Sequence, residues 1–116
     1  MQHKRTIAFI GAGNMSRSII AGLSQAGYPA GRITAANPSR PKLDALADQF
    51  GIRITQNNAE AAREADVIVL AVKPQLMAAM LEALVAELGS LAGKLLISIA
   101  AGIKVERLQE MAGGHS

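Results

Sequence analysis

An apolar run, two glycines and an amphipathic segment follow one another within residues 6–23, and they constrain the fold more than any other part of the chain. The run Ile7–Ile10 is continuously apolar, which is typical of a strand that is buried on both faces. Gly11 and Gly13 come next. Apolar residues then recur at helical spacing, at Met15, Ile19, Ile20 and Leu23. The order strand, glycine turn, helix predicts the first βα unit of an α/β protein.

The two glycines predict an anion site at the start of that helix. Gly11 would form the tight turn, and Gly13 would leave room for a pyrophosphate against the backbone. The N-terminus of the helix adds unpaired N–H groups and a partial positive charge. Ser16 occupies the third position of the glycine pattern, where a small residue permits close packing of helix on strand. We therefore expect a dinucleotide site; the alternative is a packing turn that binds nothing.

Strand and helix patterns alternate along the rest of the 116 residues. Further strands are expected at 33–36, 52–55, 66–72 and 95–99, and helices at 14–26, 41–50, 59–64, 76–88 and from 105 onward. This alternation predicts parallel βαβ units with right-handed crossovers, and the length suits one domain. The expected fold class is α/β, a doubly wound parallel sheet of Rossmann type in the order 3-2-1-4-5. We expect the methionines to fill the core from apolar helical faces.

The composition argues against several classes of protein. The chain has no Cys, which excludes disulfides, thiolate metal sites and Cys nucleophiles and fits a reducing compartment. Its net charge of +3 is scattered, and it has one Tyr and no Trp, which argues against nucleic-acid binding. The longest apolar stretch, Leu95–Ile103, is far shorter than the ~20 residues that a membrane span requires. We expect a cytoplasmic protein that binds neither nucleic acid nor membrane.

Ligands of this fold bind beyond the carboxyl ends of the strands, where three more segments should meet the glycine turn. After the second strand, Asn37, Ser39 and Arg40 stand where NAD sites usually carry an acid for the ribose 2′-hydroxyl. A guanidinium and a hydroxyl would instead bind a 2′-phosphate, which favours NADPH as the cofactor, with NADH possible. The alternative is that Ser39 only caps a helix and Arg40 is a solvated charge.

The other two segments follow the fourth and fifth expected strands. Pro74 would fix the turn after the fourth strand, and backbone groups there would line the nicotinamide ribose. Lys73 is a candidate catalytic acid, although a structural or polar-contact role is favoured. Small residues at 98–102 would let a nicotinamide lie against the sheet edge. The two His, at positions 3 and 115, lie near the termini, and no catalytic triad, metal cluster or paired carboxylates fall at the strand ends.

Taken together, these segments resemble the pyrroline-5-carboxylate reductase family, whose members use NAD(P)H in the last step of proline synthesis. The resemblance runs from Ile7 to about Gly114 and rests on segments 9–15, 71–75 and 98–102 with the Asn37 segment. Pro38 departs from it, since many bacterial members carry Arg there. The resemblance implies cofactor contacts at Gly11, Gly13, Asn14, Met15, Asn37, Ser39, Arg40, Val72, Lys73, Pro74 and Ala100. It assigns no catalytic residue.

The resemblance also implies an activity and an assembly. Residues 1–116 would be the NAD(P)-binding Rossmann domain, an N-terminal fragment lacking a C-terminal helical domain that dimerises and completes the imine site. The implied reaction is NADPH-dependent reduction of 1-pyrroline-5-carboxylate to L-proline by a homo-oligomer, with the isolated chain inactive. Two alternatives stay open: another NADP-dependent reductase, F420-dependent or similar to prephenate dehydrogenase, and a dinucleotide domain that only binds.

Overall fold

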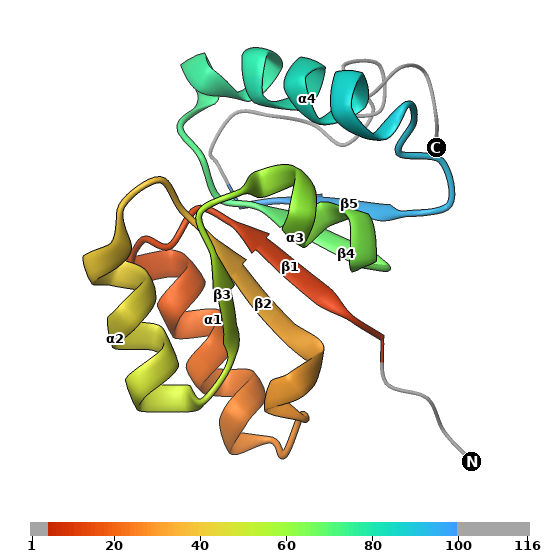
Figure 1. Ribbon diagram of the computed structural model, residues 1–116. Helices are drawn as coiled ribbons and strands as arrows, with labels where there is room; N and C mark the ends of the chain where they lie inside the picture. The colour runs from red at the N-terminus through yellow and green to blue at the C-terminus, as the bar shows by residue number, and fades with distance from the viewer. Residues whose placement is uncertain (1–4, 100–116) are drawn as a thin grey trace.

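In the computed structural model, which describes residues 5–99, a parallel sheet lies between two pairs of helices (Figure 1). The elements follow one another as β1 (Ile7–Ile10), α1 (Asn14–Gln25), a 3-10 turn (Ala30–Arg32), β2 (Ile33–Ala36), α2 (Arg40–Phe50), β3 (Arg53–Thr55), α3 (Asn58–Glu64), β4 (Val67–Leu70), α4 (Pro74–Leu88) and β5 (Leu95–Ser98). The alternation of strands and helices predicted for residues 5–99 is therefore confirmed.

The sheet has the order β3-β2-β1-β4-β5, and every neighbouring pair is parallel, as predicted. Ile7 is in register with Ile33 of β2 on one side and with Val67 of β4 on the other. The chain thus adds β2 and β3 to one side of β1, and then β4 and β5 to the other. This reversal places a crevice beyond the carboxyl ends of β1 and β4, where ligands bind in sheets of this kind.

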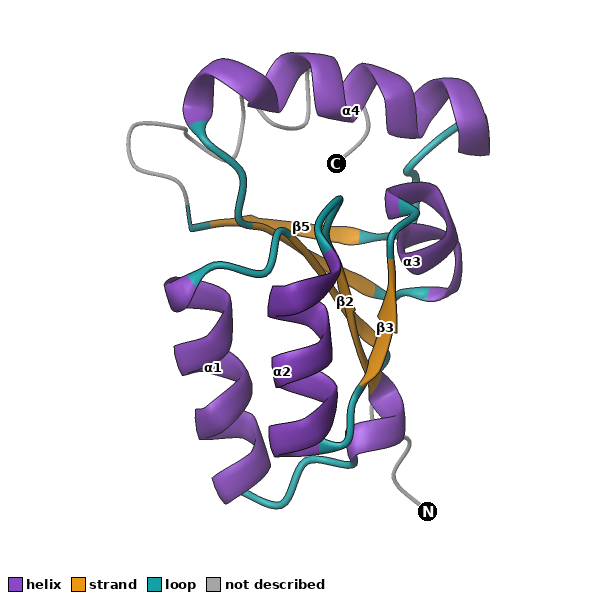
Figure 2. Cartoon of the chain, turned by 60° about the vertical axis from the view of Figure 1, so that its left-hand side comes forward, coloured by secondary structure: helices purple, strands orange, loops and turns teal. Residues whose placement is uncertain are grey.

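Alternate side chains of the central strands enter two separate cores. Ala8 and Ile10 of β1 join the core under α3 and α4, whereas Phe9 joins the core under α1 and α2. In β4, Ile68 and Leu70 enter the core under α3 and α4, whereas Val67 and Val69 enter the core under α1 and α2. Figure 2 shows the two helix pairs on opposite faces of the sheet. Burial on both faces explains why β1 and β4 are continuously apolar.

Local sequence signals set the helix boundaries. Gly51 adopts a left-handed conformation (φ 71°) and ends α2, and Pro41 lies in the first turn of the same helix. The side chain of Asn57 caps α3 by accepting a hydrogen bond from Glu60 N–H at 3.0 Å. The N-terminus of α4 is at Pro74, two residues before the expected start.

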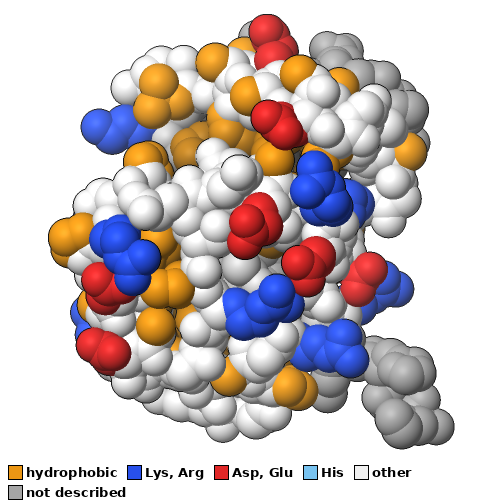
Figure 3. Space-filling model, in the orientation of Figure 1, with side chains coloured by type: hydrophobic (Ala, Val, Ile, Leu, Met, Phe, Trp, Pro, Cys, Tyr) orange, Lys and Arg blue, Asp and Glu red, His pale blue; other side chains and the backbone are white. Residues whose placement is uncertain are grey.

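Two expectations were wrong in part. The fourth strand was expected to reach Val72 but ends at Leu70, because the chain turns at 71–73 to start α4 at Pro74. Met77 is buried as expected, but 58% of Met15, in the first turn of α1, is exposed. The amphipathic segment expected from Val105 lies outside the described residues. On the face in Figure 3, acidic and basic side chains are interspersed, as the scattered net charge predicts.

Candidate functional site

The glycine turn after β1 is held in place by its neighbours on both sides. Gly11 has a φ of 107°, which favours glycine, and its N–H donates to Ala36 O at 2.8 Å. A Cβ on Gly11 would lie 2.6 Å from the carbonyl oxygen of Ala71, in the turn after β4. The turn predicted at Gly11 is therefore confirmed. Its glycine is required by close contact with a second loop as well as by backbone conformation.

Gly13 has a different reason to be glycine. Its conformation is extended (φ −81°, ψ −171°), and apart from its two chain neighbours no residue has an atom within 4 Å of the place where a Cβ would be. Gly13 is the N-cap of α1, and no side chain caps that helix start. The first N–H groups of α1 are thus left without a side-chain acceptor, beside a space that an added methyl group would occupy. This is the geometry that a pyrophosphate requires.

Ser16 holds the turn against the helix. The residue is fully buried, and its hydroxyl donates to Gly11 O at 2.8 Å. A small residue was expected here for close packing, and the observed burial agrees with that. The hydrogen bond to the turn was not anticipated, because the glycine pattern specifies only the size of this side chain.

A cavity of about 240 Å³ opens between the start of α1 and the start of α4. Its lining comes from the glycine turn, the turn after β4 and the end of β5: Gly13, Asn14, Met15, Ser16, Ala71, Val72, Lys73, Pro74 and Ile99. Gly13 and five other residues predicted to contact a cofactor are thus brought together here, namely Asn14, Met15, Val72, Lys73 and Pro74. Lys73 is exposed and is the N-cap of α4, and its side chain makes no capping hydrogen bond.

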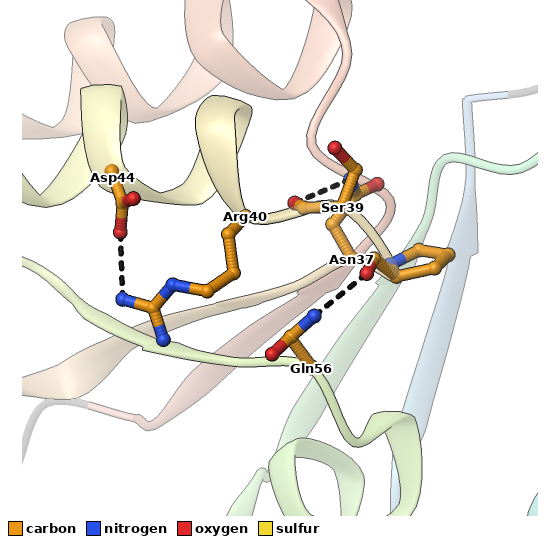
Figure 4. A network of polar contacts seen from close by, with 6 residues as sticks. Asn37, Ser39, Arg40, Asp44 and Gln56 are labelled. Carbon is orange, nitrogen blue, oxygen red and sulfur yellow. Dashed lines mark hydrogen bonds and ion pairs between the residues drawn. The ribbon is translucent and has the colours of Figure 1, made fainter.

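The segment after β2 is attached to the glycine turn by a side-chain amide. Asn37 Oδ1 accepts from Ala12 N–H at 3.2 Å, and its Nδ2 donates to Ser39 O at 3.1 Å. From the next loop, Gln56 Nε2 donates to Pro38 O at 2.8 Å (Figure 4). Asn37 therefore positions two loops at the strand ends, with both groups of its amide already engaged.

Ser39 and Arg40 were interpreted either as ligands of a 2′-phosphate or as a helix cap and a solvated charge, and the second interpretation is met only in part. Ser39 is the N-cap residue of α2, yet its side chain makes no capping hydrogen bond. Arg40 is not a free solvated charge, because its Nη2 lies 2.9 Å from Asp44 Oδ1 in an ion pair. Figure 4 shows the guanidinium on the Asp44 side, away from Ser39. A phosphate contact by either residue remains a prediction.

Two basic residues near the glycine turn were missed by sequence reasoning. Arg17 of α1 and Lys42 of α2 line a second cavity of about 230 Å³ with Gly13 and Asn14. Arg17 also donates to Gln49 Oε1 from Nε at 3.2 Å and from Nη2 at 2.8 Å. The two cations lie 25 positions apart, and only the packing of α1 beside α2 brings them together; their helical positions alone carry no such signal.

Ala100 lies outside the described residues, so its predicted cofactor contact has no structural counterpart. Within residues 5–99, no group of three or more metal-ligating side chains comes together. Nor is any helix in that range long and apolar enough to cross a membrane.

Comparison with known proteins points to one family of reductases. The chain is 54% identical over 111 residues to the pyrroline-5-carboxylate reductase of Vibrio alginolyticus, covering 96% of this chain and 40% of that protein. The reductase structure from Coxiella burnetii superposes with a TM-score of 0.88 at 38% identity, over 96% of this chain and 41% of that one. A pyrroline carboxylate reductase of Plasmodium falciparum, solved with NADP bound, superposes with a TM-score of 0.77 at 28% identity. The match covers 97% of this chain and 40% of that one.

The chain thus spans about 40% of the length of the curated relatives that it matches. A family model described as "NADP oxidoreductase coenzyme F420-dependent" matches residues 6–102, which include the glycine turn and the turn after β4 that line the cavity between α1 and α4. The chain belongs to this family of NADP oxidoreductases.

Proposed function

We propose that residues 1–116 form the NADPH-binding domain of a pyrroline-5-carboxylate reductase. The observation that carries the proposal is the uncapped start of α1, where the space at Gly13 faces the turn before α4 across one cavity. The 54% identity to a reductase of that name supports the choice of substrate. The function is therefore inferred from the site and the relatives together, because the fold alone serves many reactions.

The described residues fit such a cofactor along its length. The pyrophosphate would lie over Gly13 and accept from the first N–H groups of α1. The 2′-phosphate would lie near Ser39 and Arg40, with Lys42 as a further cation beside the turn. The cavity lined by Met15 and the turn at 71–74 would take the nicotinamide half.

When bound, NADPH supplies the hydride that reduces the imine carbon of the substrate. The residues of this chain bind and orient the dinucleotide. The apolar lining of the cavity between α1 and α4, which includes Met15, Val72 and Ile99, would exclude water from the nicotinamide. Arg40 and Lys42 would thus lie at the adenosine end of the cofactor, and Lys73 would lie beside the apolar side chains at its reacting end.

We further propose that this chain by itself does not turn over the imine. Fast hydride transfer needs both reactants held in near-attack geometry, an effect worth about 7–11 kcal/mol. Among the residues that line the cavity between α1 and α4, Lys73 is the one cation, and a single cation is a weak clamp for the carboxylate of the imine. Substrate contacts would then come from other residues of the protein.

Two other functions are compatible with the fold. The family description names coenzyme F420, and a prephenate dehydrogenase superposes with a TM-score of 0.78, but at 16% identity that likeness shows the fold alone. A domain that only binds the dinucleotide would keep the same site. The relatives named as pyrroline-5-carboxylate reductases, at 39–54% identity, favour the imine reaction over both.

Self-association and a cytoplasmic location are proposed with that reaction. On β5, an edge strand of the described sheet, 57% of Leu95 and 39% of Ile97 are exposed. Exposed apolar residues on an edge strand favour pairing with a further segment or with another copy.

A chimaera tests the proposed function. This chain replaces the matching 111 residues of the Vibrio alginolyticus reductase, and NADPH oxidation is followed with 1-pyrroline-5-carboxylate. The isolated chain is titrated with NADPH by calorimetry alongside it. We expect binding by the chain, turnover by the chimaera and none by the chain.

The outcomes separate the candidate functions. A folded chimaera that binds NADPH but leaves the imine unreduced, beside an active parent enzyme, would contradict the reductase assignment and favour the binding-only domain. Undetectable binding of NADPH at millimolar concentration by folded chain would contradict the cofactor site itself. Turnover by the chain within tenfold of the parent would place the substrate site within these residues.

A further inference from the structure

We propose that Asp44 is a specificity-determining residue that lowers the preference of this site for NADPH over NADH. The inference rests on the proposed function, because it concerns the 2′-phosphate that distinguishes the two cofactors. It follows from the contact that Arg40 makes in the structure rather than from the position of Arg40 after β2. Asp44 would hold Arg40 in an ion pair that a 2′-phosphate must displace.

The geometry of the pair supports displacement. Arg40 and Asp44 are one turn apart on α2, and the Nη2–Oδ1 distance is 2.9 Å. Their side chains are 62% and 50% exposed, so water and salt screen the pair. An exposed ion pair at this spacing is weak, and forming it changes an equilibrium constant by only about twofold. A phosphate, with more charge and three acceptor oxygens, can therefore take the guanidinium from it.

The other arginine near the glycine turn shows the contrast. Arg17 is held by Gln49, a neutral acceptor that leaves its positive charge uncompensated. Arg40 is held by a carboxylate, which cancels most of its field at a distance. Both arginines are anchored by α2, but only Arg40 has its charge neutralised by its anchor. The residue best placed after β2 to recognise a 2′-phosphate is thus the one that is restrained.

Two effects of Asp44 act in the same direction. Releasing Arg40 costs the ion pair when NADPH binds, and the freed carboxylate then lies near a phosphate of like charge. NADH carries a hydroxyl in place of that phosphate and needs neither change. Asp44 therefore weakens NADPH binding and leaves NADH binding nearly as it is.

The experiment measures the dissociation constants of NADPH and NADH by calorimetry, at one ionic strength, for the wild-type chain and D44N. We expect D44N to bind NADPH about two- to fivefold more tightly and NADH with less than a 1.5-fold change. The matched control is D48N, which removes the same charge from an exposed residue of the same helix one turn further from Arg40. D48N should change NADPH affinity by less than half as much, on a logarithmic scale, as D44N does.

A double-variant cycle tests whether Asp44 acts through Arg40. The gain from D44N should shrink when Arg40 is replaced by Ala, because only the repulsion between the carboxylate and the phosphate is then left to relieve. An undiminished gain would show simple charge repulsion and overturn the proposal.

The remaining outcomes are also decisive. Weaker or unchanged NADPH binding by D44N would mean that Asp44 positions Arg40 for the phosphate or has no part in recognition, and would overturn the inference. Because the wild-type chain is titrated in the same series, failure of the inference differs from failure of the proposed function. If only the inference fails, the wild type binds NADPH but D44N shows no greater preference for NADPH over NADH. If the proposed function fails, the wild type does not bind NADPH.

Discussion

Replacing each glycine of the turn by alanine should separate the stability of the fold from the binding of its cofactor. In Gly11→Ala, the new Cβ lies 2.6 Å from Ala71 O, and the backbone must keep a φ of 107°. Neither loop can move freely, because Gly11 N–H donates to Ala36 O and Ala71 N–H donates to Ile10 O, both at 2.8 Å. A left-handed conformation costs an L-residue about 1–2 kcal/mol, and overpacking costs about 1–3 kcal/mol more.

The free energy of unfolding of Gly11→Ala should therefore fall by about 3 kcal/mol, which lowers the melting temperature by roughly 10–15 °C for a chain of this size. Gly13→Ala is the matched control. Its φ of −81° suits alanine and its Cβ would meet no protein atom, so it should cost at most about 1 kcal/mol. The methyl group would instead fill the space proposed for the pyrophosphate and weaken NADPH binding by about tenfold or more.

Urea unfolding followed by circular dichroism measures the first effect, and calorimetric titration with NADPH measures the second. The reasoning predicts opposite patterns, with stability lost at Gly11 and affinity lost at Gly13. A Gly11→Ala protein as stable as the wild type would refute the argument from the Ala71 contact. A Gly13→Ala protein that binds NADPH normally would refute the proposed position of the pyrophosphate.

Two further predictions test contacts that join loops and helices. Asn37→Asp keeps an acceptor for the glycine turn but loses the donor to Ser39 O and adds a carboxylate. It should therefore weaken NADPH binding about tenfold while sparing NADH binding. Equal losses of affinity for the two cofactors, measured by calorimetry, would speak against a 2′-phosphate near this loop. Lys94→Met should lower the free energy of unfolding by about 1–2 kcal/mol, because Nζ donates to Ala65 O at 2.7 Å and to Arg63 O at 3.1 Å at the end of α3. An unchanged midpoint of urea unfolding would show that water replaces these contacts without loss of stability.

The strand order could be predicted because β1 and β4 are apolar along their whole length and each helix has a local start or stop signal. Burial on both faces leaves few arrangements for runs such as Ile7–Ile10, and right-handed crossovers remove most of the others. Pro41 and Gly51 act through their own backbone conformations, so their effect is readable without any partner. Local signals of this kind determine the element types and the topology.

Boundaries and contacts depended on segments that are distant in the chain. The fourth strand ends at Leu70 because the chain turns there to form α4, which its apolar pattern does not reveal. Gly11 was identified as a turn residue, but its contact with Ala71 exists only because β1 and β4 pair. Arg17 and Lys42 share a cavity because α1 packs beside α2.

The candidate site shows the same division. Sequence alone placed Gly13, Asn37 and Arg40 at the strand ends, since all follow apolar strands of one parallel sheet. The tertiary structure decided what each does there: Gly13 borders an open space, Asn37 joins two loops, and Arg40 is paired with Asp44. The physical reason is that residue type and strand pattern fix where a side chain lies in the sheet, whereas its partners are set by elements that only folding brings within hydrogen-bonding distance.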